Sequence, residues 1–215
     1  MKIALLNGSP KHRNSSSEIL LTDLKRCLLE TDTAETARRK PEILEAAFHD
    51  DRIAEETVSQ LLTADVWVFS CPLYVDGLPG HLLSVLLQLE KNIGESGHTQ
   101  VIYGIVNCGF YEGIQAKTAL EILENWCAKT GFVWGGGIGV GGGGGLAMMA
   151  GPKPEKGPKA PIEKALRAMS EKMFRQETQE NQYVSVAFPR FLYKMAAQMG
   201  WRQLFKKNGG RIRDL

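Results

Sequence analysis

Short apolar runs alternate with longer segments of helical period over the first two thirds of this chain. The runs are rich in Val, Ile, Phe or Trp and do not alternate with polar residues, which is typical of parallel strands covered on both faces. Five runs fit this description, at residues 3–6, 43–48, 66–70, 101–106 and 132–140.

The segments between these runs are predicted to be helices, at residues 16–29, 53–62, 82–89 and 114–129. In the first of them, Ile19, Leu20, Leu24 and Leu28 fall on one stripe. The repeated strand–helix order predicts an α/β fold, a three-layer doubly wound five-stranded parallel sheet of the flavodoxin-like order 2-1-3-4-5. Too few residues follow the fifth run for the six-stranded dinucleotide-binding fold. The polar segment 31–40 is predicted to be a loop.

The pattern changes after residue 146. Residues 151–161 contain four prolines and three lysines, as expected of a linker, whereas 162–176 and 188–207 have helical period. We therefore predict a flavodoxin-like domain over residues 1–150 and, over residues 151–215, a linker with C-terminal helices that pack on the core or on a dimer partner.

The composition of the chain excludes several classes of function but does not identify one. The 26 basic and 24 acidic residues give a net charge of +2, too close to balance for the whole molecule to bind a polyanion, so no nucleic-acid partner is predicted. The four cysteines stand far apart, and the histidines have no partner at ligand spacing, so we predict reduced thiols and no metal site. No run reaches about 18 apolar residues, and the start is too short for a signal peptide, so we expect a cytoplasmic protein.

The loop at residues 7–17 lies between the first strand and the first helix, at the carboxyl edge of the sheet where ligands of such folds bind. Its hydroxyl, amide and cationic side chains suit a monophosphate. Those selected as candidates are Ser9, Lys11, Asn14, Ser15 and Ser16. The loop lacks the glycine patterns of a P-loop or a pyrophosphate site. Its side chains could equally do no more than cap the following helix.

Two further loops follow the third and fourth strands and reach the same edge. The loop at 71–80 contains two prolines, two glycines and Tyr74, a flat wall with free backbone groups nearby. The loop at 107–113 joins small residues to the aromatic residues Phe110 and Tyr111. Together the three loops predict a site for a phosphorylated planar ligand.

These residues resemble the NAD(P)H-dependent FMN reductases of the flavodoxin-like superfamily. The similarity covers residues 1–145 and is carried by Gly-Ser-Pro-Lys at 8–11, Pro-Leu-Tyr at 72–74 and Asn-Cys-Gly-Phe at 107–110. The chain departs from the family at Ser15-Ser16, where Asn-Thr is usual. The resemblance implies that the phosphate of FMN is held by Ser9, Lys11, Ser15 and Ser16. It further implies that one side of the isoalloxazine is lined by Pro72, Leu73, Tyr74 and Val75, and the other side by Asn107, Gly109 and Phe110.

If FMN is bound, the flavin carries the chemistry and no catalytic side chain is predicted. Hydride would pass from NADH or NADPH through FMN to a second, small-molecule acceptor such as a flavin or quinone. A non-enzymatic electron carrier of flavodoxin type, or an azo, nitro or quinone reductase with the same site, are the alternatives. The resemblance also leads us to expect a homodimer.

Two features compete with this interpretation. Nine glycines occupy the eleven positions 135–145 and formally contain Gly-x-Gly-x-x-Gly, but no helix start follows, so we interpret the run as a flexible flap over the cofactor. The basic helix at the C-terminus could contact an anionic membrane. We favour its packing on the sheet or on a dimer partner.

Overall fold

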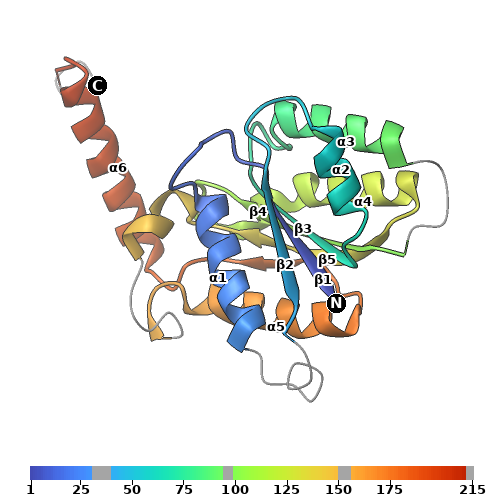
Figure 1. Cartoon of the computed structure of the whole chain (residues 1–215). Coiled ribbons are helices and arrows are strands. Elements are labelled where there is room, and N and C mark those ends of the chain that lie inside the picture. The colour runs from blue at the N-terminus through green and yellow to red at the C-terminus, as the bar shows by residue number, and fades with distance from the viewer. Residues whose placement is uncertain (31–39, 94–98, 150–155, 212–215) are drawn as a thin grey trace.

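The computed structural model describes residues 1–30, 40–93, 99–149 and 156–211. They form a six-stranded parallel sheet between two layers of helices (Figure 1). The strands are β1 (Lys2–Asn7), β2 (Glu42–Ala47), β3 (Val66–Pro72), β4 (Val101–Asn107), β5 (Val133–Val140) and β6 (Gln182–Val184). The helices are α1 (Ser16–Glu30), α2 (Glu55–Leu61), α3 (Gly80–Ile93), α4 (Lys117–Thr130), α5 (Ala160–Arg175) and α6 (Arg190–Lys207), with short 3-10 helices η1 (Gly113–Ala116) and η2 (Gly143–Met149).

The strand order is β2-β1-β3-β4-β5-β6. The predicted α/β fold and the order of the first five strands are confirmed, but the count of five strands is wrong. β6 pairs parallel with β5 through Ile138↔Gln182, Gly139↔Tyr183 and Val140↔Val184. It was not predicted because three half-buried residues at a sheet edge carry too short a pattern to be distinguished from a loop.

Two apolar cores cover the two faces of the sheet. Leu61, Leu82, Leu120 and their neighbours from α2, α3 and α4 form the core on one face. On the other face, α1 and α5 contribute Leu24 and Met169 among others to the second core. Because the inner strands β1, β3 and β4 are covered on both sides, they are almost wholly buried, which explains their uninterrupted apolar sequence.

The glycine run is not a flap. Residues 135–139 belong to β5, and Gly141, Gly142 and Gly143 are buried as well. A Cβ atom on Gly141 would overlap the carbonyl oxygen of Tyr111, and Gly136 has φ +107°, a conformation that other residues rarely adopt. The glycines therefore let backbone segments approach β5 closely.

The C-terminal extension divides into two parts. α5 buries Leu166 and Met169 against the sheet, as predicted for a helix packing on the core. α6 has no buried residue and projects away from the body of the molecule, so it does not pack on its own sheet, and its packing on a dimer partner stays a prediction (Figure 1). The predicted loop at 31–40 lies outside the described residues except for Lys40, and so does the first half of the linker at 151–161.

Candidate flavin site

The first loop closes onto the start of α1 through hydrogen bonds. The Ser15 hydroxyl accepts a hydrogen bond from the Glu18 N–H at 3.0 Å. In return, the side-chain Oε2 of Glu18 accepts a hydrogen bond from the Ser15 N–H at 3.4 Å. This reciprocal pair is a capping box, so the capping interpretation of Ser15 holds. Asn14 directly precedes it with φ +54°, a left-handed conformation that Asn tolerates better than most residues.

The other serines of this loop also have protein partners. Ser16 Oγ donates to the Gly143 carbonyl at 2.6 Å, and Ser9 Oγ accepts a hydrogen bond from the Lys11 N–H at 3.3 Å. A hydroxyl has one proton to donate, so Ser16 already uses its proton while Ser9 keeps its own for a ligand. Ser9 and Ser15 are nearly buried, at 3% and 2% exposure, and line the base of the loop.

Charge in this loop suits an anion. No acidic residue occurs between Asn7 and Ser17, and Lys11, His12 and Arg13 are exposed. The 15-residue helix α1 begins in the same loop. Unpaired N–H groups at a helix start and nearby cations stabilise a phosphate dianion. The residues present therefore fit the phosphate group of FMN.

The second loop is a tight turn that displays its side chains. Tyr74 and Gly77 exchange two backbone hydrogen bonds of 3.0 Å, and the residues between them, Val75 and Asp76, have φ +48° and +59°. Positive φ at both central residues is the geometry of a type I′ turn. The Tyr74 side chain is 46% exposed and that of Val75 is fully exposed, so both are free to contact a planar ligand.

Asn107 joins the three loops. Its side-chain Nδ2 donates to Ser17 Oγ at 2.9 Å and to the Cys71 carbonyl at 3.0 Å, and its carbonyl accepts from the Leu73 N–H at 2.7 Å. The Asn107 side chain is thus turned inward, whereas the next candidates along the loop, Gly109 and Phe110, are exposed. Pro72, at the end of β3, pairs with Asn107 in the ladder. The structure therefore brings all the predicted loops to one edge.

Sequence reasoning missed the contributions of Ser17 and of η2. Ser17 was not among the selected candidates, yet its hydroxyl receives the hydrogen bond from Asn107. The 3-10 helix η2 follows β5 and supplies the carbonyl that Ser16 binds, which makes it a fourth segment at the carboxyl edge. The glycines at 141–145, directly after the predicted strand 132–140, were the available signal.

The cysteines near the candidate site have raised pKa values. Cys71 and Cys108 are buried, and burial raises the pKa of Cys71 to about 12 and also raises that of Cys108. The thiolate is the reactive form, so neither residue is primed for redox chemistry at neutral pH. All four cysteines are buried thiols, and none of them forms a disulfide.

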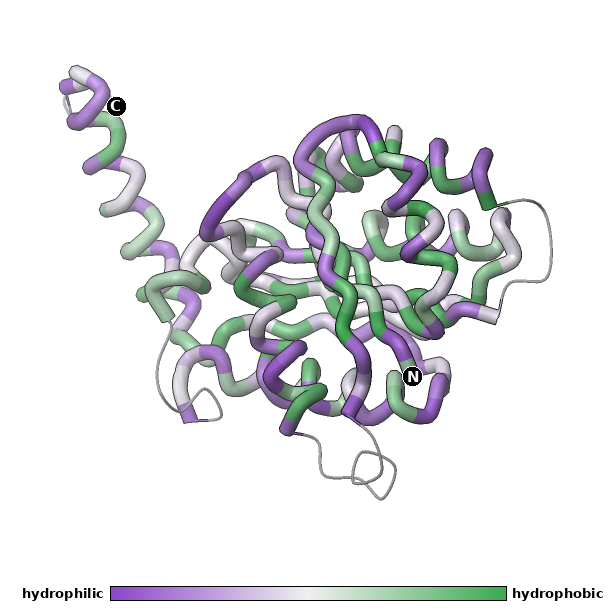
Figure 2. Tube along the Cα trace, viewed as in Figure 1, coloured by the Kyte–Doolittle hydropathy of each residue, from purple (hydrophilic) through white to green (hydrophobic). Residues whose placement is uncertain are grey.

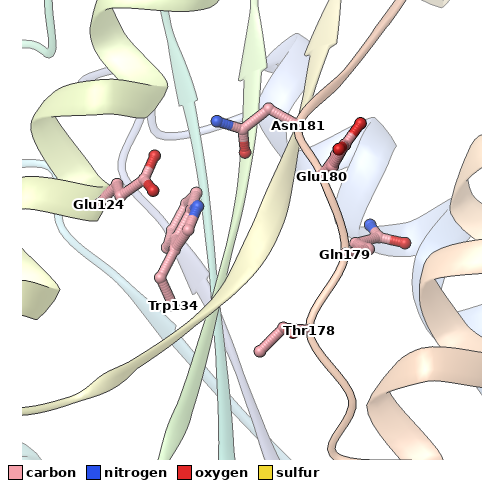
Figure 3. A pocket seen from close by; sticks show the side chains of 6 residues that line it. All are labelled: Glu124, Trp134, Thr178, Gln179, Glu180 and Asn181. Carbon is pink, nitrogen blue, oxygen red and sulfur yellow. The ribbon is translucent and has the colours of Figure 1, made fainter.

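A surface cavity of about 640 Å³ lies elsewhere, beside the start of β5 and the segment that leads into β6 (Figure 3). Its lining includes Trp134 and two carboxylates, Glu124 and Glu180. Carboxylates repel a phosphate, and the three loops are at the opposite end of the strands, so we do not assign FMN to this cavity. None of the helices in the described ranges has both the length and the hydropathy needed to cross a bilayer.

Comparison with solved structures supports the fold. An FMN-dependent NADH-azoreductase from Bacillus anthracis, solved in complex with FMN, has a TM-score of 0.56 and 13% identity, with 81% of this chain and 100% of that chain covered. A flavodoxin from Streptococcus pneumoniae has a TM-score of 0.52 and 11% identity over 81% of this chain and 99% of its own. At such low identity these similarities show the fold alone.

Among curated proteins, none matches this chain. The family model described as NADPH-dependent FMN reductase matches residues 1–144, which include all three candidate loops. FMN is the cofactor of that family, and the loops that suit its phosphate and ring lie at the sheet edge where doubly wound folds bind ligands. The chain belongs to the NADPH-dependent FMN reductase family.

Proposed function

We propose that this protein oxidises NADH or NADPH and passes the electrons through FMN to a small-molecule acceptor. The observation that carries the proposal is the junction at Asn107, which fixes an anion-binding loop beside two loops with exposed aromatic residues. When bound, FMN supplies the hydride-accepting and electron-donating chemistry.

The residues of this chain would bind and orient the reactants. Ser9, Lys11 and the N-terminus of α1 would hold the phosphate, while Tyr74, Val75 and Phe110 would flank the ring and exclude water from it. The nicotinamide of the co-substrate needs to stack close to the exposed ring face for hydride transfer, which the 46% and 58% exposed side chains of Tyr74 and Phe110 would border. The four buried cysteines form no disulfide, which is compatible with the cytoplasmic location that we propose.

Anaerobic spectroscopy tests this function. The FMN-loaded protein should be yellow, and its flavin absorbance should bleach on addition of NADH or NADPH and return on addition of an acceptor. A panel of flavins, quinones, azo dyes and nitro compounds then identifies the acceptor, and comparison of the two nicotinamides gives the preferred donor.

Two outcomes would contradict the proposal. A protein that takes up no FMN would remove its basis. A protein that binds FMN but oxidises neither nicotinamide over many turnovers would instead be an electron carrier of the flavodoxin type.

A further inference from the structure

The helix α6 is an exposed arm that carries basic and apolar side chains. No residue of the helix is buried, and apolar positions alternate with hydrophilic ones along it (Figure 2). Five large apolar side chains are 56–63% exposed, namely Phe191, Met195, Met199, Trp201 and Leu204. Monomeric proteins rarely leave this much neighbouring apolar surface in water, so the arm is an interaction surface.

The base of the arm lies beside the candidate flavin site. Tyr193 Oη donates to the Gly109 carbonyl at 2.6 Å, and the ring centroids of Tyr193 and Tyr111 lie 5.6 Å apart. Gly109 belongs to the loop after β4, which the family resemblance places against the isoalloxazine. The 18 residues of α6 extend about 27 Å from there, at 1.5 Å per residue, away from the body (Figure 1). A protein bound to the first turns of the arm would therefore lie against the loops that border the ring.

The distribution of side chains around the arm favours a protein over a membrane as its partner. A helix that lies in a bilayer interface separates a charged face from an apolar face. In α6, Lys194 precedes Trp201 by seven residues and Arg202 follows Met195 by seven, and residues seven apart share a helix face. Cations and apolar side chains are therefore mixed around the helix. Its four aromatic residues, two methionines and two arginines, with no Asp or Glu, match the composition of protein–protein interfaces.

The charge on the arm has a single sign. Residues 190–211 contain no acidic residue and six basic ones, Arg190, Lys194, Arg202, Lys206, Lys207 and Arg211. All six are exposed, and Arg190 forms an ion pair with Glu112 at 2.5 Å. A surface of this kind attracts an acidic protein, because opposite charges steer the encounter and fix the orientation of the complex.

The loops at the carboxyl edge neither add to this charge nor oppose it. Apart from Glu112, which pairs with Arg190, the exposed charged residues of the loops that follow β1, β2, β3 and β4 are three cations and three carboxylates: Lys11, Arg13, Arg52, Asp50, Asp51 and Asp76. Because these charges balance, the arm determines the sign of the charge that a partner meets beside the candidate flavin site.

We propose that α6 docks an acidic electron-carrier protein, which accepts electrons at the flavin site beside the base of the arm. The inference rests on the proposed function and adds a protein to its small-molecule acceptors. α6 lies outside residues 1–144, which the family model matches, so the docking arm goes beyond the family match. Interfaces of electron-transfer complexes are small, and a single helix with the adjoining loops suits one.

The electrons of this reaction balance with a one-electron carrier. Oxidation of one NADH or NADPH releases two electrons and one proton. Two molecules of the oxidised carrier would each take up one electron, and the proton would pass to the solvent. No further oxidant or reductant is needed.

Isothermal titration tests the docking separately from electron transfer. The probe is rubredoxin, a small acidic iron protein that carries one electron, and the contrast is cytochrome c, a basic carrier. The full-length protein should bind rubredoxin at low ionic strength and lose affinity as salt is added, whereas cytochrome c should not bind. In the double variant Lys194→Glu/Arg202→Glu, the affinity for rubredoxin should fall about tenfold or more.

The double variant Lys91→Glu/Lys129→Glu is the matched control. It makes the same change in net charge, but these lysines lie in the last turns of α3 and α4, at the opposite edge of the sheet. Its affinity for rubredoxin should equal that of the wild type. Far-UV circular dichroism should be unchanged in all three proteins.

Steady-state kinetics connect the docking to electron transfer. With NADH or NADPH as donor, the FMN-loaded wild type should reduce rubredoxin. Lys194→Glu/Arg202→Glu should lower kcat/KM for rubredoxin about tenfold or more and leave the reduction of a quinone unchanged, because a small neutral acceptor does not need the arm.

Several outcomes would overturn the inference. A wild type that reduces the quinone but neither binds nor reduces rubredoxin would contradict the docking alone, as would equal rubredoxin kinetics in wild type and arm variant. Rubredoxin binding without oxidation of either nicotinamide would contradict the proposed function as well. A wild type that binds phosphatidylserine vesicles but not rubredoxin would assign α6 to lipid. A wild-type dimer that only the arm variant loses, with no rubredoxin binding, would assign α6 to a second copy.

Discussion

Single residues decide how closely the segments at the carboxyl edge approach each other. Gly141 is buried where η1 and the preceding loop meet the end of β5, and its N–H donates to the Val184 carbonyl at 2.8 Å. Space for a side chain is absent there because the Tyr111 backbone occupies it. Gly144, three residues further on, has no atom within 4 Å of a Cβ position.

The substitution Gly141→Ala should therefore destabilise the protein, whereas Gly144→Ala should not. Overpacking against backbone typically costs about 1–3 kcal/mol in the free energy of unfolding, and we expect a value in or above this range at Gly141. At the open position, Ala should change the stability by about 0.5 kcal/mol or less. Urea unfolding of the two variants measures both values. Equal midpoints would show that the glycine run is not packed as described.

At the scale of elements, one helix start serves two purposes. Ser15 caps α1 and also lies, nearly buried, in the loop that suits a phosphate. A substitution that preserves one purpose and removes the other distinguishes them. Asp is as good a helix cap as Ser but carries a negative charge.

We expect Ser15→Asp to retain stability and lose FMN affinity. The apoprotein should unfold within about 0.5 kcal/mol of the wild type, because Asp caps the helix as well as Ser does. FMN affinity should fall at least tenfold, about 1.4 kcal/mol, through repulsion between carboxylate and phosphate. Ser15→Ala is the converse control, with about 1 kcal/mol lost from stability. Isothermal titration with FMN checks this, and unchanged affinity in Ser15→Asp would place the phosphate elsewhere.

At the scale of the whole molecule, a buried ion-pair network joins the C-terminal extension to the family domain. Glu163 of α5, with a side chain only 3% exposed, binds Arg26 of α1 at 2.6 Å and Arg167 at 3.3 Å. The Cys27 thiol donates to the same carboxylate at 3.4 Å. Burial alone would raise the pKa of Glu163, but the hydrogen bond and charge of Arg26, together with Arg167, hold it below its ordinary value.

Glu163→Gln should destabilise the protein in a pH-dependent manner. A carboxyl pKa that is lower in the folded state contributes stability above the unfolded value of 4.5 and loses it as pH falls through the folded value. The variant should lose about 3 kcal/mol at neutral pH, and its difference from the wild type should shrink below the unfolded pKa. Glu90→Gln, which breaks the surface pair with Lys129, should cost at most about 1 kcal/mol. A pH-independent difference in urea unfolding would contradict this account.

The sequence by itself determined the fold and which loops meet at the carboxyl edge of the sheet. Uninterrupted apolar runs identified the covered strands, and the loops that follow them carry the serines, cations and aromatic residues of the candidate site. These signals are local, because strand burial and helix capping depend on neighbours within a few residues.

Only the tertiary structure decided the roles of residues whose partners lie far away along the chain. Asn107 faces Ser17, 90 positions earlier, and the glycines of β5 are small because other segments press against them. β6 forms by pairing with the edge of β5, and α6 has no buried residue although Phe191, Met195 and Leu204 lie along it. Such outcomes depend on packing between distant segments, which no local pattern records.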